Sequence, residues 1–153
     1  MHPVGVEAFD TTLQKTHVWL HEIKSDLGWS SEHAAYLALK GVLHALRDRL
    51  PVDEVVQLGA QLPMLIRGLY YEGWRAAGKP ERERQEVTFL LDAVKYFGDR
   101  EQCTLLSFNP GADAEAVVRS VFRVLSRHTT EAPAVRHLLP AQLRALWPTS
   151  EHV

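Results

Sequence analysis

Apolar residues recur along most of the chain at spacings of three, four and seven, the period of one helix face. The first such stripe ends at Gly28, a residue that can close a helix in the left-handed conformation. Its members are Phe9, Leu13, Leu20, Ile23 and Leu27. Similar stripes occupy residues 35–50, 53–62, 63–73, 87–97, 113–125, 130–139 and 143–147. Since no convincing stretch alternates with the period of two typical of strands, the pattern predicts an all-α fold.

Two prolines interrupt this pattern in matching contexts. Pro63, in "QLPMLIRGLYYEGW", lacks an N–H, and its ring is incompatible with a helix interior. We therefore expect a break at Leu62 and a new helix with Pro63 in its first turn. Pro140, in "HLLPAQLRALWP", also follows a leucine, and an arginine stands four residues after each proline. Each arginine is followed, in turn, by a leucine and an aromatic residue.

These two corners extend into a longer correspondence between the halves of the chain. Val121 lies 79 residues after Val42, and Pro140 lies 77 residues after Pro63. We therefore predict a single domain, residues 1–153, folded as a helical bundle of two similar repeats with three to four helices each. We expect the first repeat at about residues 7–74 and the second at about residues 81–148. A polar hinge, residues 75–80, connects them. Chance similarity between helical segments is the alternative explanation.

The segment "VLHALRDRLPVDEVVQLGAQLP", followed by "LIRGLY", resembles the repeat of the domain-of-unknown-function family 2267, a bacterial and archaeal family of small proteins. That repeat combines an Ala-rich helix, a Val-Leu-x-x-Leu segment, a short turn, a Gln-Leu-Pro element and a following Leu-Arg. The resemblance covers most of residues 7–148, and in the second half Leu138 replaces the Gln. It implies an all-helical fold and assigns no activity or catalytic residue.

Composition and charge narrow the functional classes. The chain has 153 residues, 46% of them hydrophobic and 24% charged, which suits one globular domain. A net charge of -2 argues against a general nucleic-acid or anionic-membrane binder. The N-terminal "MHPVGVEAFD" does not resemble a signal peptide, and no apolar run approaches the roughly 20 residues of a spanning helix. Cys103 is the single cysteine, so we expect a cytoplasmic protein.

His17 and His21, in "THVWLHE", lie four residues apart, which places two imidazoles on one helix face, as a metal site requires. The chain contains neither an HExxH motif nor a pair of Glu-x-x-His motifs. Solvated or core-edge histidines are the simpler interpretation, and we expect no cofactor. A metal- or small-ligand-binding protein that uses His17 and His21, or His44 on the second helix, is therefore the alternative function.

The most distinctive patch is "LYYEGWRAAG", where Tyr70, Tyr71 and Trp74 crowd the end of a predicted helix, close to Arg67. Aromatic side chains with polar tips are enriched at binding interfaces. The competing interpretation is that two of these rings fill the seam between the repeats. We treat Tyr70, Tyr71, Trp74 and Arg67 as the candidate partner- or ligand-binding residues.

Motifs for enzymatic chemistry are missing from the sequence. We find no phosphate-binding glycine loop, no Gly-x-Ser-x-Gly and no paired carboxylates. The polar run Arg47, Asp48 and Arg49 is interpreted as a helix end with local ion pairs rather than an anion site. We therefore favour a non-enzymatic interaction module that binds an unknown protein partner or forms a homo-oligomer.

Overall fold

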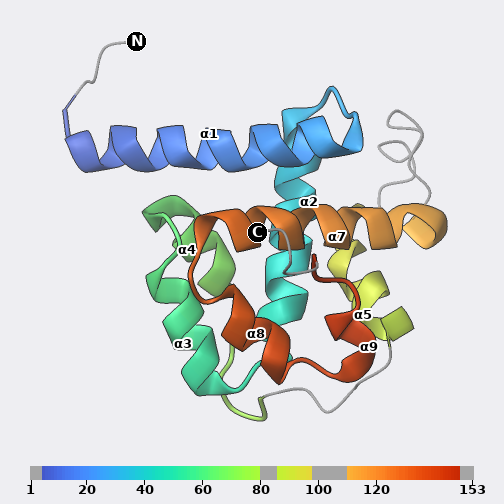
Figure 1. Ribbon diagram of the computed structural model, residues 1–153. Coiled ribbons are helices and arrows are strands. Elements are labelled where there is room, and N and C mark those ends of the chain that lie inside the picture. The colour runs from blue at the N-terminus through green and yellow to red at the C-terminus, as the bar shows by residue number, and fades with distance from the viewer. Residues whose placement is uncertain (1–4, 80–85, 98–109, 149–153) are drawn as a thin grey trace.

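The computed structural model describes residues 5–79, 86–97 and 110–148, and every regular element within these ranges is a helix (Figure 1). The all-α prediction is therefore confirmed. Cys103, Pro80 of the hinge and residues 81–85 of the predicted second repeat lie outside the described residues. The elements are α1 (Glu7–Leu27), α2 (Glu32–Arg47), α3 (Val52–Ala60), α4 (Met64–Tyr71), α5 (Glu86–Ala93), the 3-10 helix η1 (Lys95–Phe97), α7 (Pro110–His128), α8 (Ala132–Leu138) and α9 (Ala141–Arg144).

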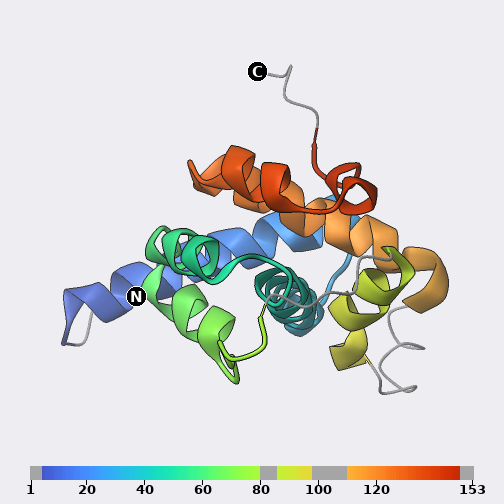
Figure 2. The ribbon, with the colours of Figure 1, turned by 90° about the horizontal axis from the view of Figure 1, so that it is seen from below.

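Helix α2 forms the centre of the molecule. Its apolar residues are buried on nearly all sides, and it contacts α1, α4, α5, η1 and α7. Figure 2 shows α2 end-on, with these helices around it. The helix end expected at Gly28 is present, since Gly28 closes α1 with a φ of 68°. The Ser31 hydroxyl accepts a hydrogen bond from the Ala34 amide at the start of α2.

Helix α1 is covered along only part of its length. Its C-terminal half buries Trp19, Leu20 and Ile23, and the helix packs against both α2 and α7. Its N-terminal half projects past α2 and α7 (Figure 1). The apolar stripe predicted from the sequence continues into that half, but there Phe9 and Leu13 are exposed. The stripe therefore has no complete cover within the described part of the chain.

The two proline corners share their geometry. Pro63 and Pro140 have φ and ψ angles of -56° and 150°, and -56° and 153°, and each forms the N-cap rather than the first turn of the following helix. Arg67 donates hydrogen bonds to the carbonyl groups five and seven residues before it, and Arg144 does the same. The aromatic residues that follow, Tyr70 and Trp147, are both buried. The corners thus match in detail, while the repeat as a whole stays a prediction.

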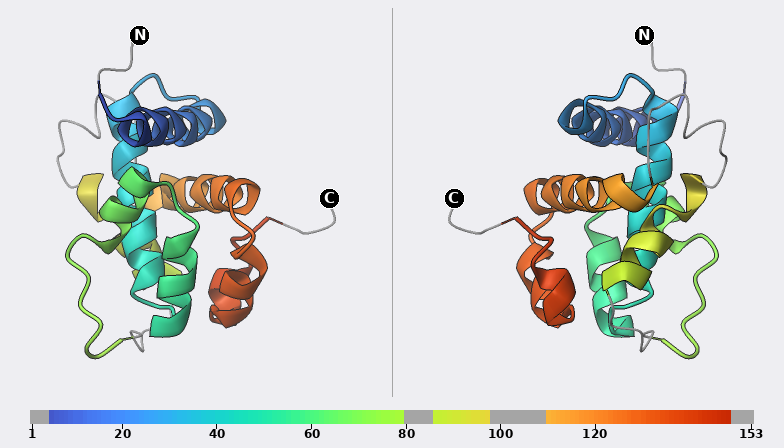
Figure 3. Two further views of the ribbon diagram at one scale, coloured as in Figure 1. Left: turned by 90° about the vertical axis from the view of Figure 1, so that its left-hand side faces the viewer. Right: turned by 90° about the vertical axis from the view of Figure 1, so that its right-hand side faces the viewer.

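Each corner leads from one short helix to another, α3 to α4 in the first half and α8 to α9 in the second. Helices α3 and α8 lie side by side on the same face of the molecule (Figure 3). Their contact joins two segments that are far apart in the sequence.

Candidate functional site

A mostly apolar groove of about 820 Å³ lies between the N-terminal half of α1 and α4, and we call it the α1–α4 groove. Helix α2 contributes two of its lining residues. The lining consists of Phe9, Thr12, Leu13, Thr16, Leu20, Tyr36, Leu39, Met64, Leu65, Ile66, Gly68, Leu69, Tyr71 and Glu72. A concave surface of this size and character is the common form of a binding site.

Four apolar side chains at this groove are strongly exposed. The exposed fractions are 57% for Phe9, 42% for Leu13, 48% for Met64 and 46% for Leu65. Single exposed apolar residues are ordinary, whereas a cluster that lines one groove is typical of an interaction surface. The cluster combines the uncovered half of α1 with the first turn of α4.

A hydrogen bond between the two walls fixes their relative position. The Thr12 hydroxyl accepts from the backbone N–H of Leu65 at 2.8 Å, and the Thr16 hydroxyl donates to the Thr12 carbonyl at 2.7 Å. The Leu65 amide is one of the first amides of α4, which have no partner within their own helix. The Thr12 side chain thus links the start of α4 directly to α1.

Gly68 faces the groove from the middle of α4, where the fold does not require a glycine. A β-carbon placed there would meet no atom within 4 Å in the described structure. By contrast, a β-carbon at Gly41 would overlap the Ala93 carbonyl, and one at Gly59 would overlap the Tyr71 hydroxyl. A glycine in the interior of a helix lowers its stability, and no packing contact explains why position 68 lacks a side chain.

The aromatic candidates divide between the core and the groove. Tyr70 is fully buried, its hydroxyl donates to the Val55 carbonyl at 2.9 Å, and burial raises the pKa of its phenol. Tyr71 lines the groove, and the Trp74 ring packs against it with centroids 5.6 Å apart. Tyr70 therefore serves the packing of α3 against α4, and Tyr71 is the one member of this cluster among the groove-lining residues.

Arg67 lies on the other side of α1, in a second groove of about 770 Å³ that also contains Lys15, Gln61 and His128. Its guanidinium donates to the carbonyl oxygens of Gly59 and Leu62, each at 2.8 Å. The Gly59 carbonyl also accepts from the Leu62 amide, so Arg67 adds a side-chain donor on both sides of the break before Pro63. Arg67 therefore stabilises the corner and does not line the same groove as Tyr71.

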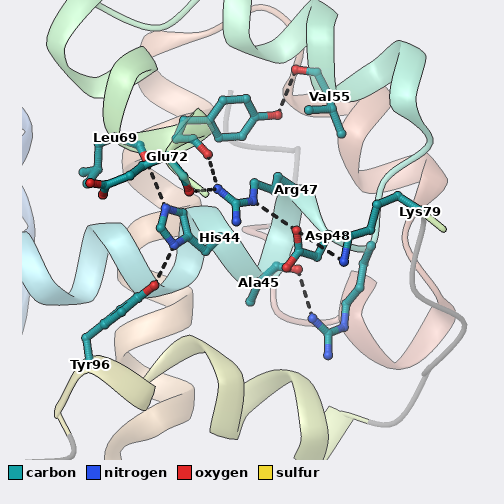
Figure 4. Close-up of polar contacts among 11 residues, drawn as sticks. His44, Ala45, Arg47, Asp48, Val55, Leu69, Glu72, Lys79 and Tyr96 are labelled. Carbon is teal, nitrogen blue, oxygen red and sulfur yellow. Dashed lines mark hydrogen bonds and ion pairs between the residues drawn. The ribbon is translucent and has the colours of Figure 1, made fainter. Parts of the chain in front are cut away.

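Two buried polar side chains of α2 hold the end of α4 (Figure 4). Arg47 Nη1 donates to the carbonyls of Tyr70 and Glu72, both at 2.7 Å. His44 Nε2 lies 2.8 Å from the Leu69 carbonyl, which can only accept, so Nε2 carries the proton. Sequence reasoning treated His44 as a possible metal ligand and Arg47 as part of a polar helix end, and missed their role as anchors of α4.

The tautomer of His44 fixes its second hydrogen bond. Because Nε2 carries the proton, the Tyr96 hydroxyl donates to Nδ1, at 2.9 Å. Burial, above all, lowers the pKa of His44, although its bond to the Leu69 carbonyl acts in the opposite direction. This neutral imidazole connects α2 to both α4 and η1.

Comparison with known protein families identifies the family of this chain. Residues 16–146 match a family described as "Uncharacterized conserved protein (DUF2267)". The chain belongs to the DUF2267 family. The resemblance found in the sequence is therefore confirmed, and the family description assigns no activity. The match includes α4, whereas Phe9 and Leu13 precede it. No curated protein matches this DUF2267 chain.

The histidine alternative has limited geometric support in this DUF2267 protein. His17 Nδ1 lies 3.1 Å from a Glu32 carboxylate oxygen, and both His17 and His21 are exposed. In the ranges 5–79, 86–97 and 110–148, no three His, Cys, Asp or Glu side chains are arranged to hold a metal ion. Within the same ranges, no helix has the length and apolar character needed to span a membrane.

Proposed function

We propose that this DUF2267 protein is a non-enzymatic interaction module whose α1–α4 groove binds the apolar face of an amphipathic helix from another protein chain. The observation that carries the proposal is the convergence of Phe9, Leu13, Met64 and Leu65, all strongly exposed, on one groove. The open space at Gly68 adds support, since a larger residue there would reduce the volume available to a partner.

The shape of the groove favours a helix as its occupant. Both walls are helices, and each presents apolar residues four positions apart, Phe9 and Leu13 on α1 and Leu65 and Leu69 on α4. Ridges of this spacing pack against the grooves of a third helix. Helix-in-groove recognition uses apolar anchors at positions i, i+3 or i+4, and i+7 of the bound segment.

Further expectations accompany this proposal. A cytoplasmic location rests on the single cysteine, and the exclusion of nucleic-acid partners rests on the net charge of -2. A duplicated origin is supported by the matching bonds of Arg67 and Arg144 at the two corners. The protein would form a homo-oligomer if the helix bound in the groove came from a second copy of the chain.

A displayed library of amphipathic helical peptides tests the proposal. Peptides are selected against the full chain, and their affinities are then measured for the wild type and for Gly68→Trp, which fills the groove. We expect selected peptides to carry apolar residues at helical spacing and to bind Gly68→Trp at least about 10-fold more weakly, a loss of about 1.4 kcal/mol. The proposal is wrong if the selected peptides bind both proteins equally.

A matched pair of surface variants separates the groove from general hydrophobicity. Leu65→Asp places a charge in the groove, and Leu91→Asp places one on an apolar residue of α5 that is 57% exposed. We expect the first variant to lose peptide binding and the second to retain it. Light scattering during size-exclusion chromatography reports whether a second copy occupies the groove, since Leu65→Asp would then convert a dimer to a monomer.

A further inference from the structure

Glu54 is a buried carboxyl group in the first turn of α3. Its side chain belongs to a residue that is only 6% exposed, and its Oε2 atom has no hydrogen-bond partner among the described residues. Burying an unpaired carboxylate is costly, because the ion loses its hydration and gains nothing in return. The environment of Glu54 therefore favours the protonated, neutral form.

A second carboxyl group faces Glu54 from the start of α8. Glu131 is the N-cap residue of that helix, and its carboxyl group acts to raise the pKa of Glu54. The Gln61 side chain fixes Glu131 in place: its Nε2 donates to Glu131 Oε1 at 3.1 Å, and its Oε1 accepts from the Thr130 amide at 2.7 Å. Glu54 and Glu131 thus belong to the starts of α3 and α8, two helices that contact each other (Figure 3).

The spacing of the pair along the chain matches that of the two proline corners. Glu131 lies 77 residues after Glu54, the same separation as between Pro63 and Pro140. Both positions carry an acidic residue.

No described cation neutralises this pair from the elements packed against α3. The guanidinium of Arg67, on α4, is bonded to carbonyl groups at the end of α3 away from Glu54. On α8, Arg136 and His137 are exposed and lie more than a helical turn from Glu131. The remaining titratable groups facing from α4 are the phenols of Tyr70 and Tyr71, whose hydroxyls lie against the Val55 carbonyl.

We propose that Glu54 and Glu131 form a proton-sensitive clasp between the halves of the molecule. When Glu54 carries a proton, the two carboxyls share a hydrogen bond and α3 stays packed against α8. When the proton leaves, two negative charges face each other in a poorly hydrated place, and the contact loosens.

The direction of the pH effect follows from burial and from Glu131. Burial first, and then the hydrogen bond and the negative charge of Glu131, raise the pKa of Glu54 from 4.5 to about 7. The folded state therefore binds this proton more tightly than the unfolded chain does. The resulting stabilisation is fully present below about pH 4.5 and is lost as the pH rises through about 7.

Thermal unfolding of the full chain at a series of pH values from 5 to 8.5 tests the clasp with Glu54→Gln, which keeps the shape and removes the charge. The informative quantity is the difference in Tm between the variant and the wild type, because His44 titrates in the opposite sense in both proteins. We expect this difference to shift in favour of the variant by about 5–10 °C between pH 5 and pH 8.5. A difference that is the same at every pH would overturn the clasp.

A control variant and a direct titration distinguish the loss of the Glu54 charge from a general effect of replacing Glu by Gln. Glu115→Gln changes an exposed glutamate of α7 that pairs with Arg119, and we expect its Tm difference to stay constant over this pH range. Carbon-detected NMR of the wild type should show the Glu54 carboxyl titrating near pH 7, and at a lower pH in Glu131→Gln that stays above 4.5 because burial remains. Titration of the wild-type carboxyl near 4.5 would overturn the clasp.

Local opening provides the final readout. In the wild type at pH 8, we expect the amides of α3 and α8 to exchange with solvent several-fold faster than in Glu54→Gln, with the amides of α2 unchanged. At pH 5 the two proteins should exchange alike. Equal exchange of α3 and α8 in both proteins at pH 8 would also contradict the clasp.

Discussion

The Thr12 hydroxyl on α1 accepts a hydrogen bond from the Leu65 amide on α4 at 2.8 Å, and this bond joins the two walls of the α1–α4 groove. Thr12 is buried even though its neighbours Thr11 and Leu13 are exposed. The bond satisfies an amide that α4 cannot satisfy within itself, so it contributes to stability as well as to the width of the groove.

Thr12→Val removes the hydrogen bond between these two walls and should destabilise the protein. The variant keeps the shape of the side chain but leaves the Leu65 N–H without an acceptor, and we expect it to lower the free energy of unfolding by about 1–3 kcal/mol. Thr11→Val, on the exposed neighbour, should change it by less than about 0.5 kcal/mol. Urea denaturation measures both values, and equal losses would show that the bond has no special role.

The glycines of α2 and α4 should respond to alanine with opposite signs. At Gly68 a methyl group meets open space, so Gly68→Ala should stabilise the protein by about 0.5–1 kcal/mol through helix propensity. At Gly41 a methyl group would overlap the Ala93 carbonyl, so Gly41→Ala should destabilise it by about 1–3 kcal/mol. Denaturation midpoints decide the matter, and destabilisation by Gly68→Ala would mean that its space is needed for packing.

Arg47→Met should weaken the end of α4. Removal of the guanidinium leaves the carbonyls of Tyr70 and Glu72 without their donor, and we expect a loss of about 2–4 kcal/mol in the free energy of unfolding. Arg119→Met is the control, because this arginine of α7 is partly exposed, and it should lower the free energy of unfolding by less than about 1 kcal/mol. Similar losses for the two variants would argue against the anchoring role of Arg47.

His44 should make stability depend on pH in the direction opposite to Glu54. Burial lowers the pKa of His44 below 6.5, so the unfolded chain takes up a proton before the folded protein does, and stability falls as the pH drops through 6.5. His44→Gln loses this dependence. We expect the variant to be less stable than the wild type at pH 8 and the gap to narrow by pH 5.5. Urea denaturation at both pH values should reveal this change, and a constant gap would show that His44 does not titrate in this way.

Local sequence signals predicted the elements and the corners well. Gly28, Ser31 and the two prolines act on the backbone within a few residues, so their effect does not depend on the rest of the fold. Helix α2 carries apolar residues around most of its circumference, and it accordingly packs against helices on several sides.

The site depended on tertiary packing that the sequence does not encode locally. Phe9 and Leu20 belong to one apolar stripe, and only the cover by other helices makes Leu20 buried and Phe9 exposed. Tyr70 and Tyr71 are adjacent and chemically alike, yet one is core and the other lines the groove. Glu54 fits an ordinary first-turn acidic residue, and only the approach of α8 brings it against Glu131.

Methyl NMR of the full chain during addition of the tightest selected helical peptide tests the binding proposal most directly. The account predicts that signals from Leu13, Met64 and Leu65 shift with saturation, while those of Leu91 and Leu138, exposed apolar residues elsewhere, stay in place. Shifts centred on Leu91 or Leu138, with the groove signals unchanged, would contradict the assignment of the α1–α4 groove as the binding site.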